Sequence, residues 1–177
     1  MSGLREERAF LSLGGNLGDP AQSMSAALHM LDESGSTRVV TVSSLHRTPP
    51  WGKVDQPDFL NVTAEVATTL APLELLALCL EVERKLKRVR VERWGPRLID
   101  IDVLLLGNSN VSDVGLEIPH PRMLDRAFVM VPLAEIAPDL VLVGRTAAQW
   151  AADLDSAGIE KLDSGRDWWR EPGDNQQ

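Results

Sequence analysis

The spacing of hydrophobic residues in the first part of the chain predicts a strand, a helix and a second strand. Residues 9–13 (AFLSL) form a short apolar run that ends at a turn rich in glycine. Asp19 and Pro20 suit the N-cap and first position of a helix, whose apolar stripe continues to about residue 32. The β-branched run 39–45 (VVTVSSL) predicts the second strand.

The next part of the chain predicts a strand, a helix and another strand. Residues 59–69 (FLNVTAEVATT) alternate well enough to form the strand. Ala71 and Pro72 then open a helix, and residues 98–106 form the last apolar run. The helix carries apolar residues at the i, i+4, i+7, i+11 positions of one face: Leu75, Cys79, Val82 and Leu86.

The predicted order is therefore βαββαβ. This is the ferredoxin-like arrangement of α+β proteins, in which helices pack on an antiparallel sheet. The segment 118–138 predicts a proline-broken loop with one or two short helical turns. Thr146 and Gln149 predict a capping box for a last helix near residues 147–155.

A long connection separates the second and third predicted strands. Residues 47–58 (RTPPWGKVDQPD) contain three prolines and a glycine, so we expect a loop of 12 residues. Loops of this length in compact domains are often functional. We therefore expect the loop to take part in ligand binding.

Composition and charge then narrow the class of protein. A chain of 177 residues, with 44% hydrophobic and 25% charged residues, suits one soluble domain. Its net charge of −8 argues against a general nucleic-acid binder. The single cysteine, Cys79, lies in an apolar run and is expected to be buried.

The sequence also indicates where the protein is located and where its domain ends. No apolar run approaches the ~20 residues of a membrane span, and the N-terminus has no signal-peptide core, so we expect a cytoplasmic protein. We expect one domain over residues 1–163. The remaining residues, 164–177, are polar apart from Trp168 and Trp169 and are expected to form a flexible tail.

Basic residues are concentrated in one stretch of this acidic chain. Residues 84–97 hold seven of the 18 lysines and arginines. Such a cluster indicates a small polyanionic ligand rather than a long polymer. A solvated helix end followed by a basic loop is the simpler explanation, and this feature alone does not choose between them.

Two aspartates interrupt the last apolar run. Asp100 and Asp102 stand two residues apart on a predicted strand, so their side chains share a face about 6–7 Å apart. Carboxylates are ligands that Mg²⁺ prefers, usually together with substrate phosphates. The nearby Arg93 and Arg97 could bind phosphate oxygens. A wet edge strand is the alternative interpretation.

Three further features allow a structural and a functional interpretation. Trp94 could stack on a flat heterocycle or fill the core. The turn 14–19 (GGNLGD) lacks the lysine and spacing of a phosphate-binding loop, so a structural turn is favoured. His120, with Arg122 and Arg126 close by, could face a phosphate or be structural.

Several motifs together resemble one known family. The stretch RWGPRLIDIDVLLLG resembles the signature of the 6-hydroxymethyl-7,8-dihydropterin pyrophosphokinases of folate biosynthesis. LSLGGNLGDP, SSLHRTPPWGKVDQPDFLN and IPHPRMLDRAFVMVPLAEIAPDL also resemble family segments, in the same order, over residues 8–141. The resemblance fades beyond residue 145.

The resemblance implies a fold, a reaction and partners. The fold would be a three-layer αβα form of the ferredoxin-like arrangement, with an antiparallel sheet and extra C-terminal elements. The enzyme would transfer pyrophosphate from ATP to the hydroxymethyl oxygen of the pterin in one direct step and release AMP. It would use two Mg²⁺ ions. From the acidic charge and the lack of a long apolar run we separately expect no nucleic-acid or membrane partner, and we expect a monomer.

The resemblance also assigns residues to roles. Asp100 and Asp102 would hold both Mg²⁺ ions, and Arg88 and Arg97 would neutralise charge at the transferring phosphorus. The basic loop is one residue shorter than usual, which leaves Arg88 and Arg90 open as candidates for that role. The ATP-binding residues would be Glu83, Arg90, Trp94, Val103, His120 and Arg126. The pterin-binding residues would be Asn16, Thr48, Pro49, Trp51, Phe59, Asn61 and Phe128.

Two other classes of function remain open at this stage. A ferredoxin-like RNA-binding module could use the basic stretch, but it would need aromatic residues on the sheet face, where only Phe10 and Phe59 are predicted. A metal-dependent phosphatase or nuclease could use Asp100 and Asp102. The reaction products would separate these possibilities.

Overall fold

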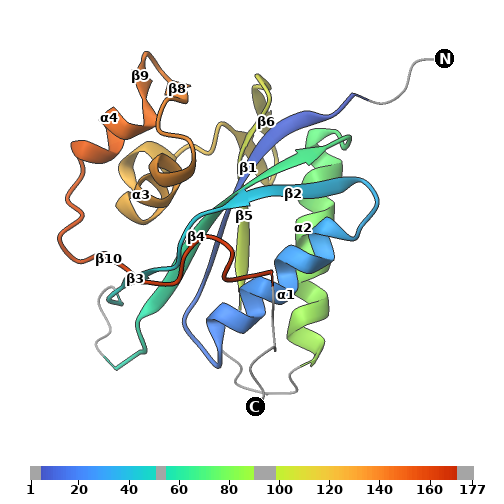
Figure 1. The fold of residues 1–177 in the computed structure, drawn as a ribbon. Coiled ribbons are helices and arrows are strands. Elements are labelled where there is room, and N and C mark those ends of the chain that lie inside the picture. The colour runs from blue at the N-terminus through green and yellow to red at the C-terminus, as the bar shows by residue number, and fades with distance from the viewer. Residues whose placement is uncertain (1–4, 51–54, 90–98, 171–177) are drawn as a thin grey trace.

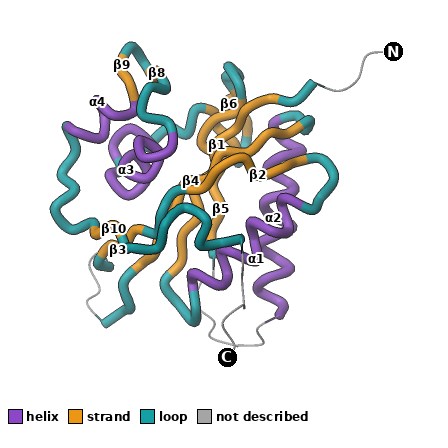
Figure 2. The backbone as a smooth tube through the Cα atoms, viewed as in Figure 1, coloured by secondary structure: helices purple, strands orange, loops and turns teal. Residues whose placement is uncertain are grey.

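A computed structural model describes residues 5–50, 55–89 and 99–170 of the chain. In these residues, an antiparallel sheet of six strands lies between helices on both of its faces (Figures 1 and 2). Its main path runs β10-β3-β4-β1-β5, and β2 also pairs with β4. The six strands are β1 (Glu7–Gly15), β2 (Thr37–Val42), β3 (His46–Thr48), β4 (Phe59–Thr68), β5 (Asp100–Leu106) and β10 (Glu160–Lys161).

The helices and two small hairpins complete the fold. Helices α1 and α2 cover one face of the sheet, and α3 and α4 lie on the other side (Figure 1). The helices are α1 (Pro20–Asp32), α2 (Pro72–Val89), the short 3-10 helix η1 (Met123–Asp125), α3 (Ala127–Ile136) and α4 (Ala147–Ala152). The hairpins are formed by β6 (Val111–Asp113) with β7 (Leu116–Ile118), and by β8 (Val141–Leu142) with β9 (Arg145–Thr146).

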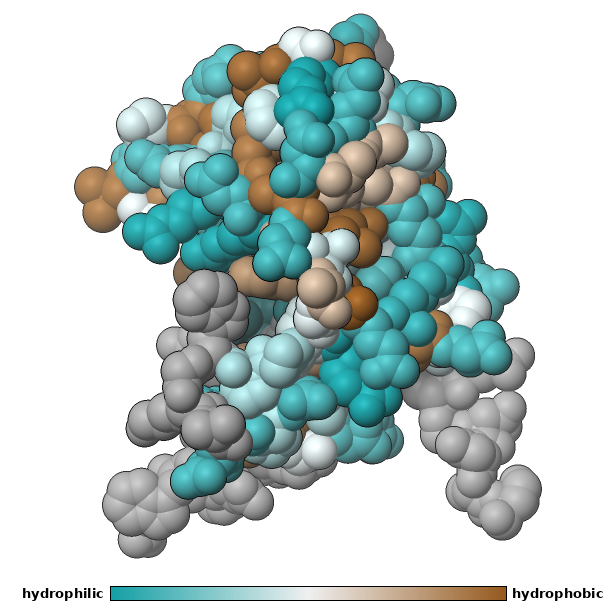
Figure 3. Space-filling model, turned by 90° about the vertical axis from the view of Figure 1, so that its left-hand side faces the viewer, coloured by the Kyte–Doolittle hydropathy of each residue, from teal (hydrophilic) through white to brown (hydrophobic). Residues whose placement is uncertain are grey.

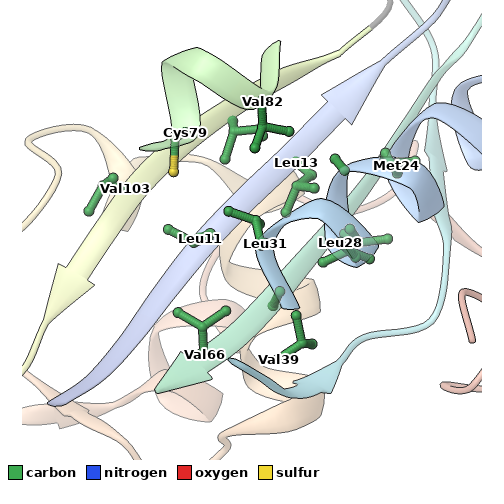
Figure 4. Close-up of a cluster of buried hydrophobic side chains, with 14 of the residues drawn as sticks. Leu11, Leu13, Met24, Leu28, Leu31, Val39, Val66, Cys79, Val82 and Val103 are labelled. Atoms are coloured by element: carbon green, nitrogen blue, oxygen red, sulfur yellow. The ribbon is translucent and has the colours of Figure 1, made fainter. Parts of the chain in front are cut away.

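Alternation along the strands divides the core between the two faces. Leu11 and Leu13 of β1 pack against α1 and α2, together with Met24, Leu28 and Val82 (Figure 4). On the other face, Phe10 and Leu104 pack with Met130 and Leu133 of α3. Because a strand sends successive side chains to opposite faces, one strand supplies both cores.

Most of the predicted elements are confirmed, with local signals acting as expected. The Asp19 side chain accepts a hydrogen bond from the Gln22 N–H at 3.2 Å, which caps α1. Thr146 and Gln149 form both bonds of the capping box that starts α4. Cys79 is buried, and burial, together with the nearby Glu83 and Asp102, raises the pKa of its thiol to about 12.

Two segments differ from the prediction. The expected strand 39–45 is the shorter β2, which begins at Thr37 and ends at Val42, and a further strand, β3, starts at His46 and runs into the first two residues of the expected loop 47–58. The expected proline-broken loop 118–138 contains the ten-residue helix α3, with Pro132 inside it. Since α3 is apolar and packs on the sheet, its burial offsets the backbone hydrogen bond that Pro132 cannot make.

Residues 164–170 do not form the expected free tail. Trp169 is only 2% exposed, and its carbonyl accepts a hydrogen bond from Ser25 Oγ at 2.8 Å. Trp168 donates from Nε1 to the Ser43 carbonyl at 2.9 Å. The two indoles provide enough apolar area to hold an otherwise polar segment against the domain.

The surface on the α3 and α4 side is mixed, with hydrophobic patches among hydrophilic ones (Figure 3). Among the described residues, no helix has the length and apolar character that a membrane crossing would require.

Candidate functional site

Strand register brings polar residues from three strands into two adjacent rows. Gly14 of β1 pairs with Asn61 of β4 on one side and with Asp100 of β5 on the other. Two residues along, Ser12 pairs with Thr63 and with Asp102. Residues opposite each other in a sheet share a face, and these rows lie on the face that α3 partly covers.

The carboxylates lie on β5, which pairs only with β1 in the described part of the chain. Asp100 is half-buried and Asp102 is exposed. A third carboxylate, Glu83 of α2, accepts a hydrogen bond from the Ile101 backbone N–H at 2.6 Å. Three acidic groups therefore meet at this edge of the sheet.

The electrostatics of this acidic group favour a cation. Burial raises the pKa of Glu83, and the neighbouring Asp100 and Asp102 raise it further, while the Ile101 N–H and Lys87 act in the opposite direction. The oxygen donors suit Mg²⁺, which proteins commonly hold by one or two carboxylates plus substrate phosphates. No cluster of three or more His, Cys, Asp or Glu residues in the described ranges has metal-binding geometry by itself.

His120 lies beside the same strand. Its backbone N–H donates to the Leu104 carbonyl at 3.0 Å, and its Nδ1 accepts from the Arg122 backbone N–H at 3.1 Å. A neutral imidazole that accepts at Nδ1 carries its proton on Nε2, so Nε2 is a donor. Burial lowers the pKa of His120, Asp102 opposes this effect, and Arg126 and Arg122 add to it.

The start of α3 supplies a cation and an aromatic ring. The Arg126 guanidinium carbon lies 5.6 Å from the centroid of the Phe128 ring. The next residue, Val129, accepts a hydrogen bond through its carbonyl from Thr63 Oγ1 at 3.4 Å. This contact fixes the first turn of α3 over the second polar row.

An amide and a hydroxyl group face each other on the side away from the carboxylates. Asn61, only 6% exposed, donates from Nδ2 to Thr48 Oγ1 at 3.0 Å. Phe59 stands two residues before Asn61 on β4, on the same face, and pairs with Thr48. A Cβ added at Gly14 would lie 2.7 Å from Asn61 Oδ1, so the glycine makes room for this amide.

Asn16 links the turn after β1 to the loop before β4. The buried side chain donates from Nδ2 to Gln56 Oε1 at 3.1 Å and to the Pro57 carbonyl at 3.2 Å. The contact is consistent with the supporting role that the resemblance implies for Asn16.

The structure therefore gathers some of the sequence-predicted residues and separates others. Asp100, Asp102, Thr48, Phe59 and Asn61 share one sheet face, with His120, Arg126 and Phe128 placed by the adjoining segment and α3. Pro49 is exposed just after β3. Arg90, Arg93, Trp94, Arg97 and Trp51 lie outside the described residues, as does the side chain of Arg88.

Val103 does not fit the expected adenine contact through its side chain. The residue is 4% exposed and packs in the core with α1 and α2 (Figure 4), because it follows Asp102 on β5 and points to the opposite face. Only its backbone could contact a nucleotide on the face of the aspartates.

Sequence reasoning assigned no role to His46, which the structure places in the first polar row. His46 of β3 pairs with Asn61 and is 2% exposed. No local signal could identify it, because its neighbours across the sheet depend on strand register.

Comparison with known proteins supports one family. Residues 10–138 match the family described as 7,8-dihydro-6-hydroxymethylpterin-pyrophosphokinase. The chain is 50% identical to a 2-amino-4-hydroxy-6-hydroxymethyldihydropteridine pyrophosphokinase of Methylorubrum extorquens, over 88% of this chain and 99% of the relative. It is 43% identical to an enzyme of the same name from Pseudomonas aeruginosa, over 88% of this chain and 97% of the relative.

Solved structures agree at the level of the fold. The wild-type HPPK-DHPS protein of Plasmodium falciparum superposes with a TM-score of 0.65 at 17% identity, over 84% of this chain. The chain spans 41% of the length of that protein. With the sequence matches and the polar rows taken together, the chain belongs to the 7,8-dihydro-6-hydroxymethylpterin-pyrophosphokinase family, whose members are transferases.

Proposed function

We propose that this protein transfers the pyrophosphoryl group of ATP to the hydroxymethyl oxygen of 6-hydroxymethyl-7,8-dihydropterin and releases AMP. The observation that carries the proposal is the row Asn61–Gly14–Asp100. Neighbouring strands lie about 4.8 Å apart, so the amide and the carboxylate stand about 10 Å apart on one face. That separation suits a planar acceptor at one end and the phosphates of ATP at the other.

The fold that supports this function is ferredoxin-like in our proposal. The strand order β5-β1-β4-β2, with α1 and α2 as the crossovers, is consistent with a βαββαβ unit. The α3 and α4 elements would supply the third layer. We also propose that the domain acts as a monomer, which sedimentation at assay concentration would test.

The acidic end of the row would bind two Mg²⁺ ions through Asp100 and Asp102. When bound, these ions would neutralise charge on the phosphate oxygens and orient ATP. Glu83 lies between the two aspartates along the strand, at the Ile101 N–H, and so adds negative charge to the same site. Burial and the two neighbouring aspartates raise the pKa of Glu83, so a bound cation would stabilise the negative charge of this site.

The phosphate chain would be bound by His120 and Arg126. The Nε2–H of His120 is a neutral donor, and the Arg126 guanidinium offers a planar set of donors that matches phosphate oxygens. Arg88 and Arg97 are proposed from the family resemblance to neutralise charge at the transferring phosphorus. In-line transfer needs this positioning and charge neutralisation more than it needs a covalent intermediate.

The pterin would bind at the Asn61 end. The amide of Asn61 offers one donor and one acceptor to the edge of the ring, and Thr48 fixes the direction of that amide. Phe128 from α3 and Phe59 from β4 would contact the faces or edges of the ring system. Both aromatic residues are partly exposed, so they have surface available for such a contact.

Product analysis tests the proposal directly. The protein is incubated with ATP, Mg²⁺ and 6-hydroxymethyl-7,8-dihydropterin, and the products are separated by chromatography. Equal amounts of AMP and pterin diphosphate are expected. ADP or free phosphate as the main product would contradict the proposal and would favour a phosphohydrolase.

A matched pair of variants tests the metal assignment. Asp102→Asn should lower kcat by at least about 100-fold, because the lost carboxylate contributes several kcal/mol of charge stabilisation, while the fold stays intact. Asp139→Asn, at an exposed position in the loop after α3, should keep wild-type turnover. Wild-type activity of Asp102→Asn at ordinary Mg²⁺ would overturn the assignment.

A further inference from the structure

His46 is a buried imidazole that the proposed reaction does not use directly. It begins β3 and stands opposite Asn61 in the strand register, so both side chains lie on the same sheet face. Thr48, the hydrogen-bond acceptor for Asn61, ends the same three-residue strand. The position of β3 therefore sets the geometry of the hydrogen bond between Asn61 and Thr48.

The hydrogen bonds of His46 fix its proton. Its Nδ1 lies 2.9 Å from the Ser44 carbonyl oxygen, which can only accept, so Nδ1 must carry a hydrogen. Its Nε2 then carries a lone pair and lies 3.8 Å from Glu135 Oε1, beyond hydrogen-bond distance. The imidazole is therefore bonded to the backbone of Ser44 and not directly to Glu135.

Glu135 is itself tightly bound to the segment before β3. The Ser44 backbone N–H donates to both carboxylate oxygens of Glu135, to Oε1 at 3.1 Å and to Oε2 at 3.2 Å. Ser44 Oγ donates to Glu135 Oε2 at 2.8 Å. Lys161 of β10 lies 3.9 Å from Glu135 Oε2. Glu135 belongs to the last turn of α3, whereas Phe128 belongs to its first turn.

We propose that His46 and Glu135, which are both hydrogen-bonded to Ser44, form a positioning pair that sets the pterin pocket. The pair joins β3, which carries Thr48, to α3, which carries Phe128, and so it fixes the two walls of the pocket relative to each other. This inference rests on the proposed function, because it concerns the substrate that Asn61 and Phe128 would bind. The pair acts on pterin affinity and leaves ATP binding nearly unchanged, since neither residue approaches Asp100 or Asp102 in its contacts.

Three histidine variants test the pair. His46→Leu removes the hydrogen bond to Ser44, whereas His46→Asn keeps a side-chain N–H near the position of Nδ1. His29→Leu is the matched control, because His29 Nε2 also lies 2.9 Å from a backbone carbonyl, that of Trp169, on the α1 side of the sheet. Steady-state kinetics give kcat and both KM values, and thermal melting gives the stability of each variant.

The expected result is a selective change. His46→Leu should raise the pterin KM about tenfold and the ATP KM less than twofold; tenfold corresponds to about 1.4 kcal/mol. His46→Asn should stay within about threefold of wild type for both substrates. His29→Leu should lower the melting temperature without changing either KM.

Several outcomes would overturn the inference. It fails if His46→Leu raises both KM values equally or neither, if His46→Asn is as impaired as His46→Leu, or if His29→Leu has the same kinetic effect. If His46→Leu does not fold, Glu135→Ala, which removes the acceptor for Ser44, must show the selective rise in pterin KM, and its absence overturns the inference. A wild-type protein that makes no AMP would refute the proposed function itself, whereas normal turnover without the selective change refutes only the pair.

Discussion

The glycine between Asn61 and Asp100 offers a sharp test of the pterin pocket. Gly14→Ala adds a Cβ that would lie 2.7 Å from Asn61 Oδ1 and 3.5 Å from the Leu60 carbonyl oxygen. Asn61 Oδ1 must therefore retreat by about 0.7 Å to reach an ordinary contact of 3.4 Å. The three nearest heavy atoms include none from Asp100, so the acidic side should be undisturbed.

The size of the effect follows from the hydrogen bond that the movement breaks. Asn61 Nδ2 donates to Thr48 Oγ1 at 3.0 Å, and a buried hydrogen bond of this kind contributes roughly 0.5–1.5 kcal/mol. We expect Gly14→Ala to raise the pterin KM up to about tenfold, since tenfold corresponds to about 1.4 kcal/mol. The ATP KM should stay within twofold of the wild-type value.

A double-mutant cycle in the same AMP-release assay separates this mechanism from a general defect. In the Asn61→Ala background the clashing oxygen is absent, so adding Gly14→Ala should change the pterin KM less than twofold. If Gly14→Ala has the same effect in both backgrounds, or raises both KM values together, the contact between Gly14 and Asn61 does not position the pterin and the reasoning is wrong.

Three further predictions concern stability. Trp169→Ala removes a large buried side chain and should lower the free energy of unfolding, measured by urea titration, by about 3–5 kcal/mol. An unchanged urea midpoint would show that residues 164–170 do not pack on the domain in solution. Val143 is 79% exposed and has a φ of 46°, so Val143→Asn should raise the free energy of unfolding by about 1 kcal/mol. The strand control Val141→Asn should not raise it. Burial lowers the pKa of His46 below 6.5, so the unfolded chain binds a proton more readily than the folded chain, and the free energy of unfolding should fall as the pH drops below 6.5. His46→Asn should reduce the slope of the free energy of unfolding against pH. An unaltered slope would exclude His46 as its source.

Local patterns in the sequence were sufficient to predict the core of the fold. Alternation in β1 and β4, the helical stripe of α2 and the caps at Asp19 and Thr146 depend on neighbours within a few residues. The two aspartates of the D-x-D pattern were predicted to share a face, and strand β5 places them so by the same local geometry.

What the sequence could not provide depends on contacts between distant segments. The packing of Trp169 on α1 joins residues 144 positions apart, so composition alone predicted a tail. His46 and Glu135 are 89 positions apart in sequence, and only strand register and the position of α3 bring them together.

The position of the site follows from where α3 stops covering the sheet. On this face, β1 changes from Phe10 to Ser12 to Gly14, while β5 changes from Leu104 to Asp102 to Asp100. The two strands are antiparallel, so both become polar toward the same end of the sheet.

The boundary between the apolar and polar parts lies at the first turn of α3, where the Val129 carbonyl accepts from Thr63. A carboxylate or amide buried under the helix without a partner would cost several kcal/mol, so the polar groups buried near the helix, such as Thr63 and Asn61, are hydrogen-bonded, and the exposed carboxylate of Asp102 lies beyond it. The same helix thus has two functions: its apolar residues close the second core, and its first turn ends that core beside the polar rows. A substitution that extended α3 over Gly14 would therefore cover Asp100 and Phe59, which are partly exposed, and should block both of the proposed substrate sites at once.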